Sequence, residues 1–276
     1  MNNFSKIISD KFLMECVAYL YCKEINISKY QIPMPSVKVI NKLINEEVIS
    51  KEKNQIIDKE LGYACYEHYR QNNNNDFFDQ LLVNKSKNKK VILDLCCGPG
   101  ATVQSLCRYN PEIIYAMDIN PRYISIVKEI FPNNNFGGTQ VIPILGDAHS
   151  IPLKNETVDY VVCRVSIQYL AVDIVLKEIY RVLKRGGTIF LIVHGSGYLL
   201  NYFFMRKKLL SKDSFSFFKN IFIRKESVAR AKFLFSGNLI KKLDKIGFIE
   251  NQLLTNNSYK ELRYFPVYFA LNGNKK

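Results

Sequence analysis

The stretch VILDLCCGPGATV, residues 91–103, joins an apolar, β-rich run to a helical pattern. Gly98 and Gly100 lie between the two, where glycines let the backbone approach a ligand at the start of the helix. A dinucleotide site usually has a third glycine three residues further on, but Val103 stands there. Asp94, which ends the strand, would repel a diphosphate. The loop therefore favours a ligand that carries positive charge.

From residue 91 onward, β-rich runs alternate with helical patterns, which is typical of β-α-β units and a mostly parallel sheet. Strands are expected at about residues 91–95, 113–118, 140–145, 158–163 and 188–193. Helices are expected between them, at about residues 101–109, 121–131 and 172–184, the last ending at Gly186 and Gly187. Pro143 predicts that its strand lies at a sheet edge, because proline cannot donate to the ladder.

Residues 1–88 are predicted to form a helical appendage and a linker, and residues 89–276 the main α/β domain. Apolar residues recur at helical spacing in 4–23 and 36–60, and the segment GYACYEHYR adds a third helical pattern. It places Tyr63, Tyr66 and Tyr69 on one face. Residues 196–235, rich in Phe, Leu, Lys and Arg, are expected to form a helical insertion over the ends of the strands.

Composition limits the kinds of protein this can be. The chain is 276 residues long and 47% hydrophobic, enough for a sizeable core without disulfides or metal. Its seven cysteines show no C-x-x-C spacing, and His68, His149 and His194 lie far apart, so no metal site is expected. The first residues do not resemble a signal peptide, and no apolar run is long enough to span a membrane, so we expect a cytoplasmic protein.

The net charge of +14 is unevenly distributed along the chain. Residues 196–276 hold 16 Lys and Arg against 5 Asp and Glu, which accounts for most of the excess. A basic region of this kind is a candidate for contact with an anionic partner. The insertion at 196–235 is therefore expected to act either as a lid or as a docking surface for a membrane or RNA, unless it simply exposes a solvated basic face.

Around the glycine loop, the sequence resembles the class I S-adenosylmethionine (SAM)-dependent methyltransferases. These carry D-x-G-x-G-x-G, and Asp94, Gly98 and Gly100 match it, with Cys96 in place of the first glycine. A similar D-L/V-C-C-G-T variant occurs in quinone-pathway C-methyltransferases of the methyltransferase type 11 group. The strand at 158–163, the segment RVLKRGG and a late G-F pair also resemble family motifs, so the likeness covers residues 89–194 closely and 237–273 loosely.

The resemblance implies a cofactor, SAM, with S-adenosylhomocysteine (SAH) as product and no metal. Asp118 would accept hydrogen bonds from the ribose hydroxyls, with Ile119 beside it, and Asp147 and Ala148 would meet the adenine. It also implies a Rossmann-like sheet of seven strands in the order 3-2-1-4-5-7-6, with strand seven antiparallel. That order places the Pro143 strand at an edge and Pro266 at the first residue of strand seven.

Methyl transfer needs alignment of donor and acceptor, and a base only where the acceptor must lose a proton. His194 and Tyr169 are the predicted catalytic residues, because they follow strands at the edge where ligands bind in such sheets. Gln168 and His149 are weaker candidates at the same edge, and His194 could instead be a hydrogen-bonded strand-end residue.

Two further cofactor contacts are predicted near this edge. Arg164 follows the fourth strand, where it could face the cofactor or close the strand end in an ion pair. Tyr69 is chosen from the three tyrosines as a residue over the methionine end of SAM, although all three could simply pack.

The methyl acceptor is less well defined by the sequence. The D/N-P-P-Y/F motif typical of enzymes that methylate nucleobase amines is absent at Cys163–Ser166. We therefore expect transfer to O, C or N of a small molecule that is lipophilic or anionic. RNA, protein or a membrane-associated acceptor, bound through the basic third of the chain, is an alternative, as is a non-catalytic SAM-binding partner subunit. The oligomeric state stays open.

A first prediction follows from the resemblance at Asp118. The Asp118→Ala protein is expected to lose SAM binding, because it lacks the carboxylate that would hold both ribose hydroxyls, while it keeps its fold. Calorimetric titration with SAM, together with circular dichroism, measures both. Unchanged affinity would refute this assignment of Asp118.

Overall fold

The computed structural model describes residues 4–26, 32–73, 76–132, 135–198, 234–261 and 264–276. Within these ranges the strands of the main sheet are β1 (Val91–Leu95), β2 (Ile113–Asp118), β3 (Asn135–Phe136), β4 (Thr139–Leu145), β5 (Val158–Arg164), β6 (Leu183–His194), β7 (Phe248–Leu254) and β10 (Tyr268–Lys275). The helices are α1 (Phe4–Ser9), α2 (Lys11–Glu24), α3 (Val37–Asn45), α4 (Lys59–Asn73), α5 (Phe77–Lys85), α6 (Ala101–Leu106), α7 (Pro121–Ile130), α8 (Val172–Val182) and α11 (Ser236–Ile246).

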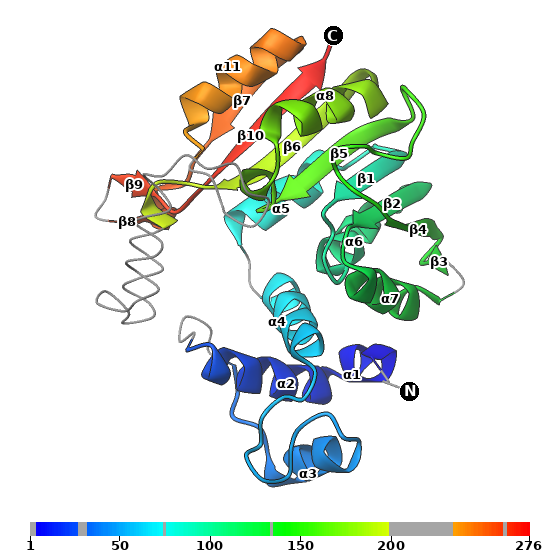
Figure 1. The fold of residues 1–276 in the computed structure, drawn as a ribbon, viewed down its shortest axis with the longest axis vertical. Helices are drawn as coiled ribbons and strands as arrows, with labels where there is room; N and C mark the ends of the chain where they lie inside the picture. Colours follow the sequence, from blue (N-terminus) through cyan, green and yellow to red (C-terminus); the bar gives the residue numbers. More distant parts are fainter. Residues whose placement is uncertain (1–3, 27–31, 74–75, 133–134, 199–233, 262–263) are drawn as a thin grey trace.

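The eight strands form one sheet in the order β3-β4-β2-β1-β5-β6-β10-β7 (Figure 1). Without β3, this is the predicted order 3-2-1-4-5-7-6, and β10 runs antiparallel to both neighbours as expected. The prediction of seven strands was wrong by one, because the short β3 pairs with the start of β4. Pro143 lies beyond that pairing and has a strand neighbour only on the β2 side, which suits a residue without an N–H.

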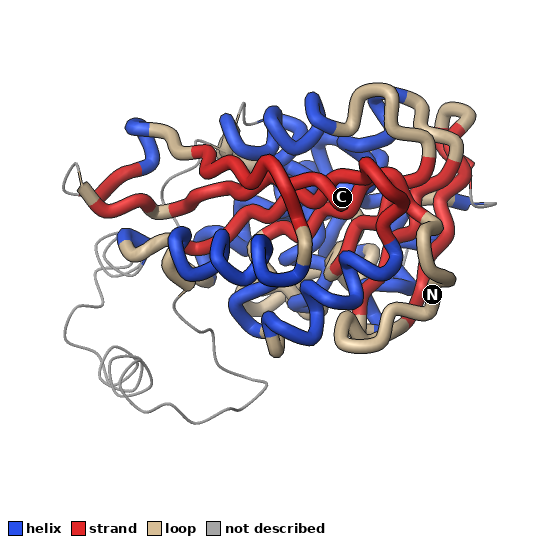
Figure 2. The backbone as a smooth tube through the Cα atoms, turned by 90° about the horizontal axis from the view of Figure 1, so that it is seen from above, coloured by secondary structure: helices blue, strands red, loops and turns tan. Residues whose placement is uncertain are grey.

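Helices cover both faces of the sheet (Figure 2), because the strands alternate buried residues between two cores. In β1, Leu93 packs in the core that includes α8 and α11, whereas Ile92 packs in the core that includes α5, α6 and α7. A third core joins α1 to α4 and includes Ile126 of α7. Figure 1 shows these amino-terminal helices at the end of the sheet where the parallel strands finish.

Helix α5 was not predicted, yet it contributes Phe78 and Leu82 to the core beneath the sheet. It begins after Asp76, whose carboxylate accepts hydrogen bonds from the N–H groups of Phe78 and Asp79. The domain boundary at residue 88 stays a prediction, although α5 packs with the sheet that follows it. Of residues 36–60, α3 and the first two residues of α4 are helical, and Ile49 and Ile56 make a β-bridge between the two helices.

Two further boundaries differ from the prediction. Helix α8 ends at Val182 rather than at the glycine pair, and β6 starts at once with an irregular segment in which Gly186 has φ +72°. Pro266 lies not in the seventh strand but in β9 (Phe265–Pro266), which pairs with β8 (Lys260–Glu261) before β10 begins. In both places the start of the strand is determined by pairing with a neighbouring strand rather than by the local propensity of its residues.

The expected insertion at 196–235 falls almost wholly on residues 199–233, outside the described residues, so its predicted structure and roles stay predictions. Among the helices of the described ranges, none has the length and apolar character needed to cross a membrane.

Gly100 offers a stability test. It has φ +86°, and a Cβ there would lie 3.1 Å from a methyl of Val127 and 3.3 Å from the Phe131 ring. Gly186 has φ +72° but open space around it. Gly100→Ala is expected to destabilise the protein by about 2–3 kcal/mol and Gly186→Ala by about 1 kcal/mol, because only the first adds crowding to backbone strain. Denaturant unfolding compares them, and equal losses would contradict the packing argument.

Candidate functional site

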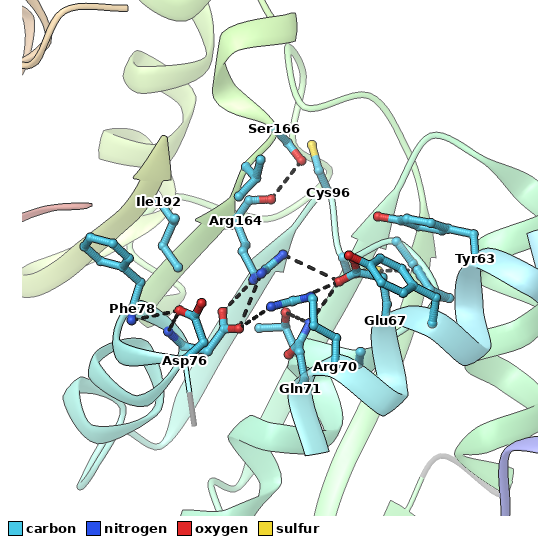
Figure 3. A pocket seen from close by; sticks show the side chains of 18 of the residues that line it. Tyr63, Glu67, Arg70, Gln71, Asp76, Phe78, Cys96, Arg164, Ser166 and Ile192 are labelled. Carbon is cyan, nitrogen blue, oxygen red and sulfur yellow. Dashed lines mark hydrogen bonds and ion pairs between the residues drawn. The ribbon is translucent and has the colours of Figure 1, made fainter. Parts of the chain in front are cut away.

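A cavity of about 520 Å³ lies between the ends of β1, β2, β5 and β6 and helix α4 (Figure 3). One wall is the β1–α6 loop with Cys96 and Gly98, together with Thr102 at the start of α6. The opposite wall is the face of α4 that carries Tyr63, Tyr66, Glu67 and Arg70. Other lining residues are Asp118, Tyr123, Arg164, Ser166, Tyr169, His194, Tyr198 and Tyr268. The cavity therefore lies at the carboxyl ends of the parallel strands, where open α/β sheets bind ligands.

The β1–α6 loop turns sharply through residues with positive φ: Cys96 (+60°), Gly98 (+54°) and Gly100 (+86°). The Gly98 N–H donates to Asp118 Oδ2 at 2.9 Å, and the Asn120 N–H donates to Oδ1 at 2.9 Å. Asp118 thus fixes the loop from the end of β2. A Cβ at Gly98 would meet nothing within 4 Å, so the loop leaves space above it for a ligand.

Asp94 lies below this loop rather than on the cavity wall. Its side chain is buried, and Oδ2 has no hydrogen-bond partner among the described residues. Burial and the nearby charge of Asp118 raise the pKa of Asp94 to about 8. A buried acid with a spare oxygen suits the predicted role of facing a positive group in the loop, and that role stays a prediction.

The predicted adenine residues lie outside the cavity lining. Asp147 Oδ1 accepts from the N–H of His149 at 2.9 Å and contacts its Nδ1 at 2.6 Å, and these hydrogen bonds lower the pKa of Asp147. His149 Nε2 accepts from the N–H of Ala171, so His149 joins this loop to the start of α8. Ala148 is buried, whereas Ile119 is 67% exposed beside Asp118. Their contacts with adenine stay predictions.

Arg164, which is partly buried, belongs to a cluster with three buried charges, here called the charge cluster: Glu67, Arg70, Asp79 and Arg164. Arg164 Nε lies 2.6 Å from Asp79 Oδ1, and Arg70 Nη1 lies 2.7 Å from Asp79 Oδ2. Glu67 Oε2 lies 2.9 Å from Arg70 Nη2 and 3.5 Å from Arg164 Nη1. Burial alone would raise the pKa of Asp79, but Arg164 and Arg70 outweigh it and lower the pKa to about 2.

Arg164 therefore closes the strand end in ion pairs and also lines the cavity. Its contact with the cofactor stays a prediction. Glu67, Arg70 and Asp79 were not predicted as site residues. Glu67 and Arg70 lie one helical turn beyond Tyr63 and Tyr66 on the same face of α4, and this spacing could have indicated them. No such pattern pointed to Asp79, because helix α5 was not predicted.

The tyrosines of α4 divide between two surroundings. Tyr63 and Tyr66 line the cavity, whereas Tyr69 is absent from its lining, although Tyr66 and Tyr69 both pack against the core of α1 to α4. The predicted contact of Tyr69 with the cofactor therefore gains no support from the cavity lining and stays a prediction. Positions three apart drift around the helix, so the third tyrosine leaves the face that the first two share.

His194 and Tyr169, the predicted catalytic residues, both line the cavity. Gln168 Nε2 donates to His194 Nδ1 at 3.2 Å, and the imidazole stacks on Tyr198 with 3.5 Å between ring centroids. Burial, and then the charge of Arg164, lower the pKa of His194 to about 3. Burial also raises the pKa of Tyr169. His194 is thus a weak base and Tyr169 stays protonated at neutral pH, so neither is suited to strong general-base catalysis.

No cluster of three or more His, Cys, Asp or Glu arranged to hold a metal ion occurs in the part of the chain that the structure describes.

Comparison with known proteins identifies the class. Residues 93–191 match a family model described as a methyltransferase domain. An uncharacterized methyltransferase-like protein of Schizosaccharomyces pombe is 32% identical over 114 residues, covering 41% of each chain. O-methyltransferase 3 of Dictyostelium discoideum is 24% identical over 193 residues, covering 67% of this chain and 42% of that protein. The chain thus matches about two fifths of the length of these relatives.

Among solved structures, phosphoethanolamine N-methyltransferase 2 of Haemonchus contortus, in complex with S-adenosyl-L-methionine, shares the fold. The TM-score is 0.56 at 13% identity, covering 86% of this chain and 60% of that one. With this fold and the match at 93–191, the chain contains a methyltransferase domain with the fold of the class I SAM-dependent enzymes.

Asp94 yields a prediction that separates stability from binding. The pKa of Asp94 in the folded protein is about 8, above its ordinary value of 3.8. The folded state therefore loses stability as the pH rises from about 4 to about 8. Asp94→Asn removes that loss and is expected to stabilise the unliganded protein at pH 8 by a few kcal/mol, on the order implied by such a shift, with little gain at pH 4. It should also weaken SAM binding at least about tenfold, by loss of an opposing charge.

Thermal unfolding across pH and SAM calorimetry measure the two effects. Asp173→Asn removes a surface carboxylate paired with Lys242 and is the matched control. A pH-independent stability change in Asp94→Asn would contradict the assigned pKa.

Proposed function

We propose that this chain transfers a methyl group from SAM to an O, C or N atom of a small molecule held in the cavity. The observation that supports this proposal is that a single cavity is lined by residues of the segment 96–102, by Asp118, and by Tyr169 and His194. Donor and acceptor can therefore meet at the ends of β5 and β6 without a separate channel.

The residues present fit SAM. Asp118 lines the cavity, and its carboxylate oxygens keep lone pairs beyond the backbone N–H groups that they already accept. Gly98 leaves open space over the loop, and Asp94 has an oxygen without a partner in the described residues. These groups would hold the ribose and the charged amino-acid end. When bound, SAM supplies an electrophilic methyl carbon with a neutral thioether as leaving group.

The protein's own contribution is then positioning and exclusion of water. Tyr63 and Tyr66 on α4 face the loop across the cavity, and the charge cluster holds α4 there. Since His194 is a weak base and Tyr169 stays protonated, the chemistry depends on alignment rather than on proton removal by the protein. Acceptors that already present a nucleophilic lone pair are favoured.

The test is transfer of labelled methyl from SAM into a cell extract by the purified full chain. Label is expected in the small-molecule fraction, and Asp118→Ala serves as the control that should give none. Label confined to RNA, protein or lipid would refute the small-molecule acceptor. SAM binding without turnover in any extract would instead support a non-catalytic partner subunit.

A further inference from the structure

The cavity is acidic although the chain as a whole is basic. Its described walls carry four carboxylates, Glu67, Asp76, Asp79 and Asp118, and two guanidinium groups, Arg70 and Arg164. The only histidine on the walls, His194, is neutral at physiological pH. The described walls therefore carry a net charge of about −2, in a protein whose overall charge is +14.

The two arginines are committed to carboxylates. Asp79 contacts both guanidinium groups, and Glu67 completes the cluster from α4. An anionic ligand would have to displace one of these buried carboxylates, and leaving a buried charge without its partner costs about 3–5 kcal/mol. The charge cluster thus opposes an anionic acceptor on the described walls.

Aromatic rings line the same space. Seven tyrosines face the cavity, and four of them, Tyr21, Tyr63, Tyr66 and Tyr123, form a tyrosine cluster with ring centroids 5.7 to 6.4 Å apart. Tyr63 lies close to Glu67, and Tyr123 lies close to Asp118; the carboxylates and burial raise the pKa of both phenols. Neutral rings next to carboxylates form a surface that attracts organic cations.

We propose that the methyl acceptor is a small organic amine, whose nitrogen binds against the tyrosine cluster beside Glu67 and Asp118. SAM at neutral pH carries one carboxylate, one ammonium and one sulfonium, a net charge of +1. Its binding would leave the walls at about −1, which matches one further positive charge. This inference rests on the proposed function and names its acceptor class, correcting the expectation of a lipophilic or anionic one.

The reaction that follows balances without a protein base. The bound ammonium first releases its proton to water. The unprotonated nitrogen then donates its lone pair to the methyl carbon, the N–C bond forms, and the S–C bond breaks with its electron pair remaining on sulfur as the thioether of SAH. Positive charge thus moves from sulfur to nitrogen within the same negative field. A primary or secondary amine then releases a proton to water, and a tertiary amine ends as a quaternary ammonium.

The experiment uses the full chain in three steps. Calorimetry first measures SAH binding; its absence would refute the proposed function and this inference with it. Choline, its neutral isostere 3,3-dimethylbutan-1-ol and the anion 3,3-dimethylbutanoate are then titrated onto the SAH-saturated protein. Choline is expected to bind at least about tenfold more tightly than the alcohol, as a cation over aromatic faces should, and the carboxylate not to bind. Normal SAH binding with equal or tighter binding of the alcohol or carboxylate, or with no choline binding, overturns the amine proposal alone.

Variants of Tyr63 then test the location. Tyr63→Leu removes a ring of the cluster and is expected to weaken choline binding about 2- to 30-fold, whereas Tyr63→Phe keeps the ring and most of the affinity. Tyr109→Leu, at a tyrosine outside the cavity lining, is the matched control. SAH affinity confirms that each variant is folded. Unchanged choline affinity in a Tyr63→Leu protein that binds SAH would place the cation elsewhere.

Discussion

The charge cluster of Glu67, Arg70, Asp79 and Arg164 is the constraint on which the rest of the site depends. It joins three elements, α4, α5 and the end of β5. Buried charges are tolerable only when each has a partner, so the four groups fix one another's positions far more narrowly than apolar packing would. The position of α4 over the glycine loop is a consequence, and the cavity is the space that remains between them.

The loop beneath α4 combines strain with support. Cys96 occupies the left-handed region at φ +60°, where a residue with a Cβ costs about 1 kcal/mol or more, in the place where the family has glycine. Hydrogen bonds from Gly98 to Asp118 and from Cys97 to the Met117 carbonyl tie the turn to β2. The turn is therefore held by the neighbouring strand rather than by the preferences of its own residues.

Features that depend on local sequence pattern could be predicted from the sequence, whereas those that depend on contacts with residues distant in the chain could not. The glycine loop, the strands and the sheet order followed from periodicity and from the family motifs, and the structure confirms them. Helix α5 was not predicted because it is only nine residues long and follows a run of polar residues, although Asp76 is a typical N-cap residue. Tyr63 and Tyr66 could not be separated from Tyr69, because the spacing alone does not show which side of α4 faces the cavity. Arg164 was noted at the strand end, but its ion pairs require residues 85 and 97 positions away.

Charge within the cavity can oppose the charge of the whole chain because electrostatic interactions in salt solution are short-ranged. At physiological ionic strength a solvent-exposed charge is screened within about 8 Å, whereas groups in the partly desolvated cavity interact with much less screening. Glu67 is almost fully buried beside Tyr63, and Asp118 lines the same walls. A bound ligand therefore responds to these few carboxylates and not to the lysines and arginines that give the chain its +14. For this reason the overall charge, which suggested an anionic partner, is a poor guide to the ligand of the cavity, and the two properties can serve separate interactions.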